Sequence, residues 1–244
     1  MSKLTKRFFS MNILPRKFLP APDAEPEPKR IEDTLAFLIK VCGVTNEQDA
    51  EIAIAAGANA LGFNFDPRNP RSIDASRARQ IVQAVRGDYL KVGVFFNPTE
   101  DELLETAGRI PLNVLQLHGD SAPFHLAKSL SVWQGIRSDA IPNSLSPDVT
   151  AWVLDTPSSS SQNGAGRERG FEWSQSAQFS GRAIVSGPLE ASNVISAIEI
   201  ARPWGVDACA CLESKPGEKD PERLKDFVAA ALAGFRLYPV EKPA

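Results

Sequence analysis

Two side chains capable of proton transfer each stand at the end of a short apolar run. Cys42 ends the run AFLIKVC (36–42), and Asp155 ends the run AWVLD (151–155). A partly ionised thiol can remove a proton and a carboxylic acid can donate one, so this pair suits acid–base catalysis. The chain has only two histidines, and none of its polar residues has the spacing of metal ligands. The residues therefore favour proton transfer over metal-assisted hydrolysis.

The elements that must position these side chains alternate between two kinds of segment. Segments with helical periodicity, such as the one containing Ile81, Val82 and Val85, separate apolar runs. Runs that are apolar on both faces indicate parallel strands covered by helices. Eight units close a barrel, so we expect an α/β fold, a single (β/α)8 TIM barrel. The eight runs are residues 36–42, 60–65, 90–96, 113–117, 132–136, 151–155, 183–186 and 206–210.

A doubly wound sheet would give the same alternation, but its usual phosphate-binding signature is missing. The first run continues as Cys42-Gly43-Val44-Thr45 rather than as G-x-G-x-x-G. In a TIM barrel, functional side chains follow the carboxyl ends of the strands. Besides Cys42 and Asp155, these positions hold Asn64, Asp66, Asn97, Gln116, His118, Arg137, Ser186, Gly187, Cys209, Ala210 and Cys211.

Composition restricts the partners and the compartment. The net charge of -3 argues against nucleic acid, because binding a phosphate backbone needs a basic surface. No apolar run approaches the roughly 18 residues of a membrane span. The three cysteines are too few for a disulfide framework, which favours a reducing compartment. We therefore expect a cytoplasmic protein that binds neither nucleic acid nor membrane.

The first residues are not expected to join the barrel. Several basic residues precede the first acid, Asp23. Four prolines lie in the segment from Pro20 to Pro28. Prolines at that spacing interrupt helices and central strands. We therefore expect a disordered basic and proline-rich tail at 1–35, the barrel at 36–236 and a C-terminal tail at 237–244. A later start at Met11 or an organelle presequence are alternative interpretations of the tail.

A series of short motifs resembles one family in chain order. The sequence is similar to phosphoribosylanthranilate isomerases over roughly residues 37–232, and the order of the motifs makes the resemblance specific. The motifs are IKVCGVT (39–45), AGANALGF (56–63), NPR (69–71), KVGVF (91–95), LQLHGD (115–120), LDT (154–156), FEW (171–173), NV (193–194), RPWGVD (202–207) and PGEKD (216–220).

The resemblance implies a reaction and a set of roles. The reaction is an Amadori rearrangement of N-(5-phosphoribosyl)anthranilate to 1-(2-carboxyphenylamino)-1-deoxyribulose 5-phosphate, in tryptophan biosynthesis. Cys42 matches the family's general base, Asp155 its general acid, and Arg71 the residue that holds the anthranilate carboxylate. No metal or organic cofactor is implied, because the substrate nitrogen serves as the electron sink. We expect a small phosphosugar substrate and a monomer or homodimer. His118 is expected to have a structural role.

The loops that bind the substrate phosphate depart from the family pattern. The family usually has Gly-Gly after the seventh strand and Ser-Ser-Gly after the eighth. This chain has Ser186-Gly187-Pro188 and Cys209-Ala210-Cys211. Backbone N–H groups of these loops would still bind phosphate, although Pro188 has none to offer. Two alternatives stay open at this point, namely a diverged barrel enzyme acting on another phosphosugar, and a non-catalytic paralogue or sensor that uses the three thiols.

Overall fold

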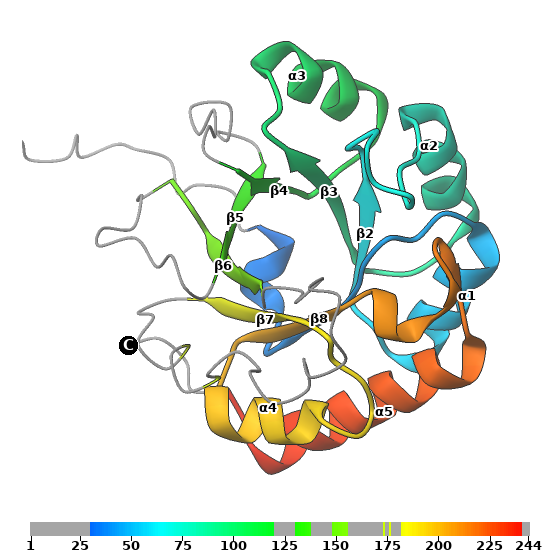
Figure 1. Ribbon diagram of the computed structural model, residues 1–244. Helices are drawn as coiled ribbons and strands as arrows, with labels where there is room; N and C mark the ends of the chain where they lie inside the picture. Colours follow the sequence, from blue (N-terminus) through cyan, green and yellow to red (C-terminus); the bar gives the residue numbers. More distant parts are fainter. Residues whose placement is uncertain are drawn as a thin grey trace, which may run out of the picture.

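Eight parallel strands close into a barrel in the computed structural model, which describes residues 30–119, 130–137, 148–155, 173, 176 and 182–240 (Figure 1). Each strand pairs with the next in the chain, and the last pairs with the first. The TIM barrel expected from the sequence is thereby confirmed. The strands are β1 (Leu38–Val41), β2 (Ala60–Asn64), β3 (Leu90–Phe96), β4 (Val114–His118), β5 (Ser131–Arg137), β6 (Ala151–Asp155), β7 (Ala183–Gly187) and β8 (Gly205–Ala208).

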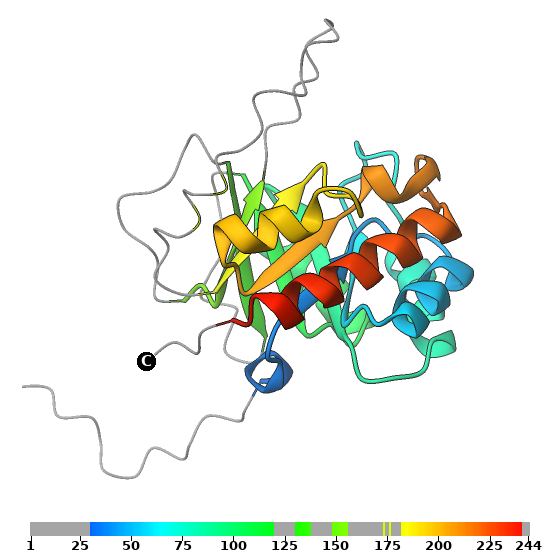
Figure 2. The same cartoon turned by 90° about the horizontal axis from the view of Figure 1, so that it is seen from below.

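Helices cover the outside of the barrel where the periodicity predicted them (Figures 1 and 2). At the starts of four of the five described helices, a side chain accepts a hydrogen bond from one of the first free backbone N–H groups. Asn46, Asp74 and Asp220 cap three of them in this way, and Thr99 forms a capping box with Glu102. The helices are α1 (Glu47–Ala56), α2 (Ala75–Ala84), α3 (Glu100–Arg109), α4 (Val194–Ala201) and α5 (Pro221–Leu237). None of the described helices is both long enough and apolar enough to cross a membrane.

The core has two layers, which the alternation of side chains along each strand creates. Ile39 and Val41 of β1 belong to the layer between strands and helices, whereas Leu38 belongs to the layer inside the barrel. Lys40 and Cys42 therefore share the inward face with Leu38. The same alternation carries a chemically active side chain at the end of a strand into the barrel mouth.

The amino-terminal end of the barrel is closed by a short 3-10 helix, η1 (Ile31–Thr34). Its Glu32 is only 1% exposed and accepts hydrogen bonds from Ser131 Oγ (2.7 Å) and Trp133 Nε1 (2.9 Å). Arg182 Nη1 lies 3.4 Å from the same carboxylate. Residues 31–34 are thus folded, although they lie within the range predicted as a tail, because a carboxylate satisfied by three groups fixes this turn.

Replacing Glu32 should reduce stability without changing activity. Glu32→Ala leaves a buried hydroxyl and an indole N–H without their acceptor and removes one of two carboxylates beside Arg182, so we expect a loss of about 3 kcal/mol in the free energy of unfolding. Urea unfolding measures it, with Glu105→Ala as the control because its ion pair with Arg109 is exposed. A loss no larger than in the control would show that η1 does not stabilise the barrel.

The eighth strand ends two residues earlier than its apolar run predicted. Cys209 has φ -137° and ψ -85°, which leaves the extended region, and the chain turns into the 3-10 helix η4 (Ala210–Leu212). A small antiparallel pair follows, β9 (Glu213–Lys215) with β10 (Glu218–Lys219). Because of this turn, Cys209 and Glu213 come close to the barrel mouth from outside the strand.

Candidate active site

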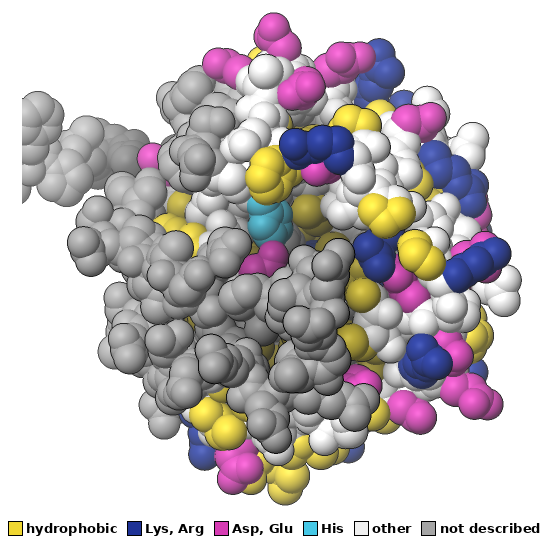
Figure 3. All heavy atoms as spheres, in the orientation of Figure 1, with side chains coloured by type: hydrophobic (Ala, Val, Ile, Leu, Met, Phe, Trp, Pro, Cys, Tyr) yellow, Lys and Arg dark blue, Asp and Glu magenta, His cyan; other side chains and the backbone are white. Residues whose placement is uncertain are grey.

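A cavity of about 300 Å³ lies at the carboxyl ends of the strands. This size suits a small-molecule ligand. Figure 3 shows this face of the molecule, with a histidine side chain (cyan) near its centre, and His118 lines the cavity. Gly187, Ala210 and Cys211 are not among the lining residues, although the sequence grouped them with this site. Five predicted site residues do line the cavity together: Cys42, Arg71, Asp155, Ser186 and Cys209.

Inside the barrel next to Cys42 lies a buried ion pair. Lys40 Nζ is 2.7 Å from Asp207 Oδ2, and the two side chains are 0% and 3% exposed. Burial raises the pKa of Asp207 to about 7 in spite of the nearby ammonium group. Burial opposes the charge of Lys40, but Asp207 and Cys42 outweigh it and raise the pKa of the lysine. Lys40 therefore stays protonated beside these two acidic partners.

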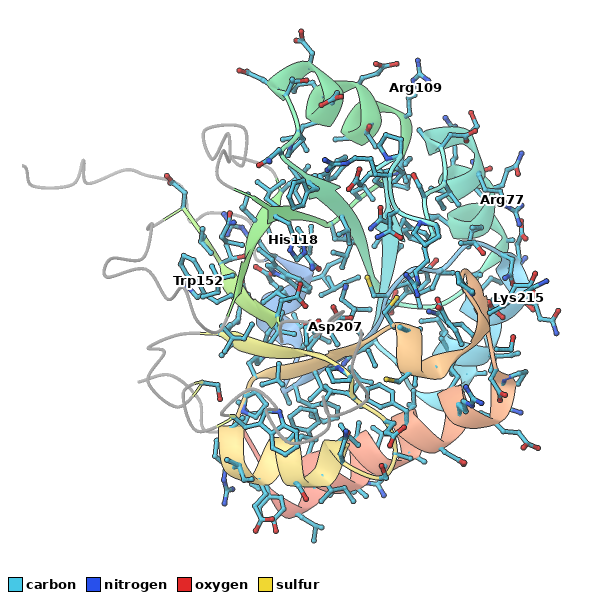
Figure 4. The ribbon with its side chains drawn as sticks, viewed as in Figure 1. Arg77, Arg109, His118, Trp152, Asp207 and Lys215 are labelled. Atoms are coloured by element: carbon cyan, nitrogen blue, oxygen red, sulfur yellow. The ribbon has the colours of Figure 1, made fainter. Side chains whose placement is uncertain are left out.

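Asp207 offers one unsatisfied oxygen to the cavity that it lines (Figure 4). Its Oδ1 is buried and has no hydrogen-bond partner among the described residues. Ser186 Oγ lies 3.5 Å from the other oxygen. A buried acceptor without a partner is costly, so a hydroxyl of a bound ligand would be stabilised there.

Cys42 is held in surroundings that favour its thiolate. A hydrogen bond from Cys209 lowers the pKa of Cys42; burial acts in the opposite direction, and the nearby Lys40 and Lys219 add to the lowering. Gly62 of β2 leaves the required space, because a Cβ there would lie 2.8 Å from Cys42 Sγ and 3.0 Å from Lys40 Cε. The arrangement can supply a base at neutral pH.

The guanidinium of Arg71 already has a partner, which the sequence did not predict. Its Nε and Nη2 donate to both carboxylate oxygens of Glu213 at 2.7 to 3.0 Å. Burial alone would raise the pKa of Glu213, but Arg71 and Lys219 outweigh it and lower this pKa. Arg71 Nη1 has no acceptor among the described residues, so this nitrogen of the guanidinium can still donate a hydrogen bond to a ligand carboxylate.

His118 lies close to Asp155 across the barrel mouth. Its Nδ1 is 3.8 Å from Asp155 Oδ2, and its Nε2 is 2.8 Å from Gln116 Nε2. Because the Gln116 amide nitrogen donates, the neutral ring carries its own proton on Nδ1, the nitrogen that faces Asp155. Burial lowers the pKa of His118 and keeps the ring neutral. Gly135 of β5 makes room for the ring, since a Cβ there would lie 2.3 Å from Nδ1.

The sequence did not single out four charged residues of this site. Lys40 and Asp207 interrupt the apolar runs of β1 and β8, and a charge inside a buried strand was the available signal. Glu213 and Lys219 lie in β9 and β10 and are 7% and 5% exposed. Their pairing depends on the turn at Cys209, so no local pattern predicts it.

The fold and the site define a (β/α)8-barrel enzyme whose cavity combines an activated thiol with a carboxyl group. No group of three or more potential metal ligands occurs among the described residues. Residues 39–230 match the family described as N-(5'-phosphoribosyl)anthranilate (PRA) isomerase, abbreviated PRAI. The chain belongs to this family and is an isomerase of tryptophan biosynthesis.

Single relatives match this chain over nearly their whole length. The N-(5'-phosphoribosyl)anthranilate isomerase of Solibacter usitatus is 43% identical over 203 residues, which are 82% of this chain and 99% of that protein. A solved PRAI in complex with reduced 1-(o-carboxyphenylamino)-1-deoxyribulose 5-phosphate has a TM-score of 0.67 and 30% identity, covering 81% and 99% of the two chains. Monomers generated from the dimeric Thermotoga maritima enzyme have a TM-score of 0.65 and 29% identity, covering 80% and 98%.

Proposed function

We propose that this chain isomerises N-(5-phosphoribosyl)anthranilate with Cys42 as general base and Asp155 as general acid. The observation that carries the assignment is their placement: both line one cavity, Cys42 after β1 and Asp155 at the end of β6. The base is held between cations, whereas Asp155 is 42% exposed and faces His118. A small phosphosugar fits a cavity of this size.

The proposed reaction opens the furanose ring and then moves a proton from C2′ to C1′. Asp155 donates a proton to the furanose ring oxygen as the C1′–O bond breaks, and the nitrogen lone pair forms a C1′=N iminium ion. Cys42 then removes the proton from C2′, which gives an enaminol. This intermediate gains a proton at C1′ and releases the proton of its C2′ hydroxyl as the ketone forms, which returns the thiol and the carboxyl group to their starting protonation states. The substrate's nitrogen takes up the electrons, so the proposal needs no metal or organic cofactor.

The neighbouring side chains support these steps. Lys40 stabilises the thiolate form of Cys42 before it accepts the C2′ proton. His118, with its proton on Nδ1, faces the carboxyl group of Asp155 and can orient it. Asp207 Oδ1 is free to accept a hydrogen bond from a ribose hydroxyl.

The substrate phosphate would be bound by backbone groups after β7 and β8. The amides of Cys209, Ala210 and Cys211 have no acceptor among the described residues. In the other loop Leu189 N–H already donates to Gly187 O at 2.8 Å, and Pro188 has no N–H. Ser186 and Gly187 end β7, and Gly187 has φ +136°, which suits glycine. The altered loop after β8 can therefore replace donors that the loop after β7 lacks.

Two further expectations belong to the same proposal. We place the enzyme in the cytoplasm, where its three free cysteines would stay reduced. We also expect a monomer or a homodimer, since a relative from Thermotoga maritima is described as dimeric. Light scattering of the purified full chain distinguishes these two states.

One assay tests the function directly. Purified protein should abolish the fluorescence of phosphoribosylanthranilate as it is converted, and the gene should restore growth of a tryptophan auxotroph lacking this step. Conversion of another phosphosugar together with failure on this substrate would overturn the proposal.

Loss of the Arg71 guanidinium should weaken substrate binding more than turnover. The carboxylate that Arg71 would hold is charged in both ground and transition states, so Arg71→Ala should raise KM by about 10- to 100-fold with kcat within a few-fold. Steady-state kinetics measure this, with Arg109→Ala on the distant α3 as the control (Figure 4). An unchanged KM would show that Arg71 pairs with Glu213 and does not bind the substrate.

A further inference from the structure

A second cysteine lies next to the proposed base. Cys42 N donates to Ala208 O at 2.9 Å, so the residue after β1 lies beside the end of β8, and Cys209 is the next residue. The Cys42 and Cys209 side chains interact electrostatically, and both residues line the cavity. Gly43 leaves room for both Cys209 and Arg71, since a Cβ there would lie 2.9 Å from Cys209 Sγ and 2.7 Å from Arg71 Cδ.

The charges around the two thiols are balanced when one of the thiols is ionised. Three cations surround the two thiols, namely Lys40, Lys219 and Arg71, but only two carboxylates balance them, Asp207 and Glu213. One negative charge is missing from this buried network even when both carboxylates are ionised. A single thiolate supplies it, whereas two adjacent thiolates would repel each other.

The contacts decide which thiol keeps its proton. Cys209 Sγ lies 4.0 Å from Glu213 Oε1, a carboxylate that can accept only a long hydrogen bond from the protonated thiol and that disfavours a second anion there. Lys219 Nζ is 3.8 Å from the same sulfur, but it is also 2.9 Å from Glu213 Oε1, which offsets its charge. Hydrogen bonding to Cys42 and burial raise the pKa of Cys209, while the pKa of Cys42 is lowered. Cys209 is therefore the donor and Cys42 the acceptor.

We propose that Cys209 is a positioning residue whose S–H donates to the Cys42 thiolate, keeping the base ionised and fixing the direction in which its sulfur faces the substrate. The inference rests on the proposed role of Cys42. A serine hydroxyl could donate in the same way, so the role requires a donor at this position rather than a thiol in particular. The side chain of Cys209 thus serves the base, while its backbone N–H stays available to the phosphate.

Other titratable groups around Cys42 must be considered when its ionisation is measured. Those that face the cavity or the thiol pair come from β1, β4, β6 and β8, from the loop after β2, and from the β9–β10 pair. They are Lys40, Asp66, Arg71, His118, Asp155, Asp207, Glu213 and Lys219. Substitution of Cys209 leaves all eight in place, so a change in the Cys42 ionisation reports on the thiol donor.

The test follows the reactivity of Cys42 itself. Alkylation by iodoacetamide, located by peptide mass spectrometry, is followed over about three pH units on either side of neutrality in the full chain. A hydrogen bond to an ionised group changes an ionisation constant by about 10- to 100-fold, so the midpoint of Cys42 alkylation should rise by about one to two pH units in Cys209→Ala. In Cys209→Ser the midpoint of Cys42 alkylation should lie close to that of the unmodified protein. Cys211→Ala, a matched loss of one thiol that does not line the cavity, should leave the Cys42 midpoint unchanged.

Activity gives a second, independent measurement. The acidic limb of kcat/KM against pH should move upward in Cys209→Ala by the same amount as the alkylation midpoint. A folded Cys209→Ala protein, verified by its circular dichroism, with an unchanged Cys42 midpoint would overturn the inference. If instead Cys42→Ala keeps full activity, the proposed function of Cys42 fails while the alkylation midpoint still tests the thiol pair. The two failures are therefore distinguishable.

Discussion

Cys42→Ala is expected to reduce kcat by about 100- to 10,000-fold, because general bases contribute on this order. The substitution removes the atom that accepts the C2′ proton and leaves Lys40, Arg71 and Lys219 in place. Substrate binding should change little, since the groups proposed to bind carboxylate and phosphate are elsewhere. The decay of phosphoribosylanthranilate fluorescence under saturating substrate measures kcat, and its concentration dependence gives KM.

Cys42→Ser provides the matched control for this prediction. Serine has nearly the same shape but a hydroxyl that the same cations cannot ionise near neutral pH, so its loss of kcat should approach that of alanine. A serine variant close to full activity would show that the residue only fills space or donates a hydrogen bond. Comparable turnover in Cys42→Ala would remove the residue from the chemistry altogether.

The sequence was sufficient to predict the barrel because each strand is encoded locally. All eight apolar runs became strands, since residues apolar on both faces must be buried on both faces. The prediction extended β8 to residue 210 because Cys209 and Ala210 are small and apolar like a strand continuation. The turn at Cys209 is a backbone feature that its residue type does not signal.

The site was predictable only in part, and the missing part is long-range. Cys42 and Asp155 follow from their places at strand ends, which is where barrel chemistry occurs. Lys40 and Asp207 pair across 167 residues of sequence, and Arg71 and Glu213 across 142, so neither pairing has a local pattern. Closure of β8 against β1 and the turn after β8 bring these groups together.

His118 illustrates the same limitation on the opposite side of the mouth. The sequence interpretation gave it a structural role, because a single histidine at a strand end carries no sign of its neighbours. Gly135 in β5 is what admits the ring, and the ring then lies 3.8 Å from Asp155. A glycine in a buried strand can mark such a close approach, but it does not say which side chain will occupy the space.

Asp155→Ala is expected to reduce kcat by about 100- to 10,000-fold, through ring opening rather than through proton removal at C2′. The carboxyl group ends β6, is 42% exposed and is reached from the cavity, so a small acid can enter the space that alanine leaves. Formic acid added to Asp155→Ala should therefore restore part of the turnover. It should not restore Cys42→Ala, because that variant lacks a base.

Asp155→Asn separates this acid role from a packing role. Asparagine fills the space of the carboxyl group but cannot supply an acidic proton, so this variant should be as slow as Asp155→Ala and should not respond to formic acid. His118→Gln, which removes the ring facing Asp155 and keeps the acid, should cost less than either substitution. Turnover near that of the unmodified enzyme in Asp155→Asn would contradict the assignment, because the ring oxygen would then be receiving its proton from another group.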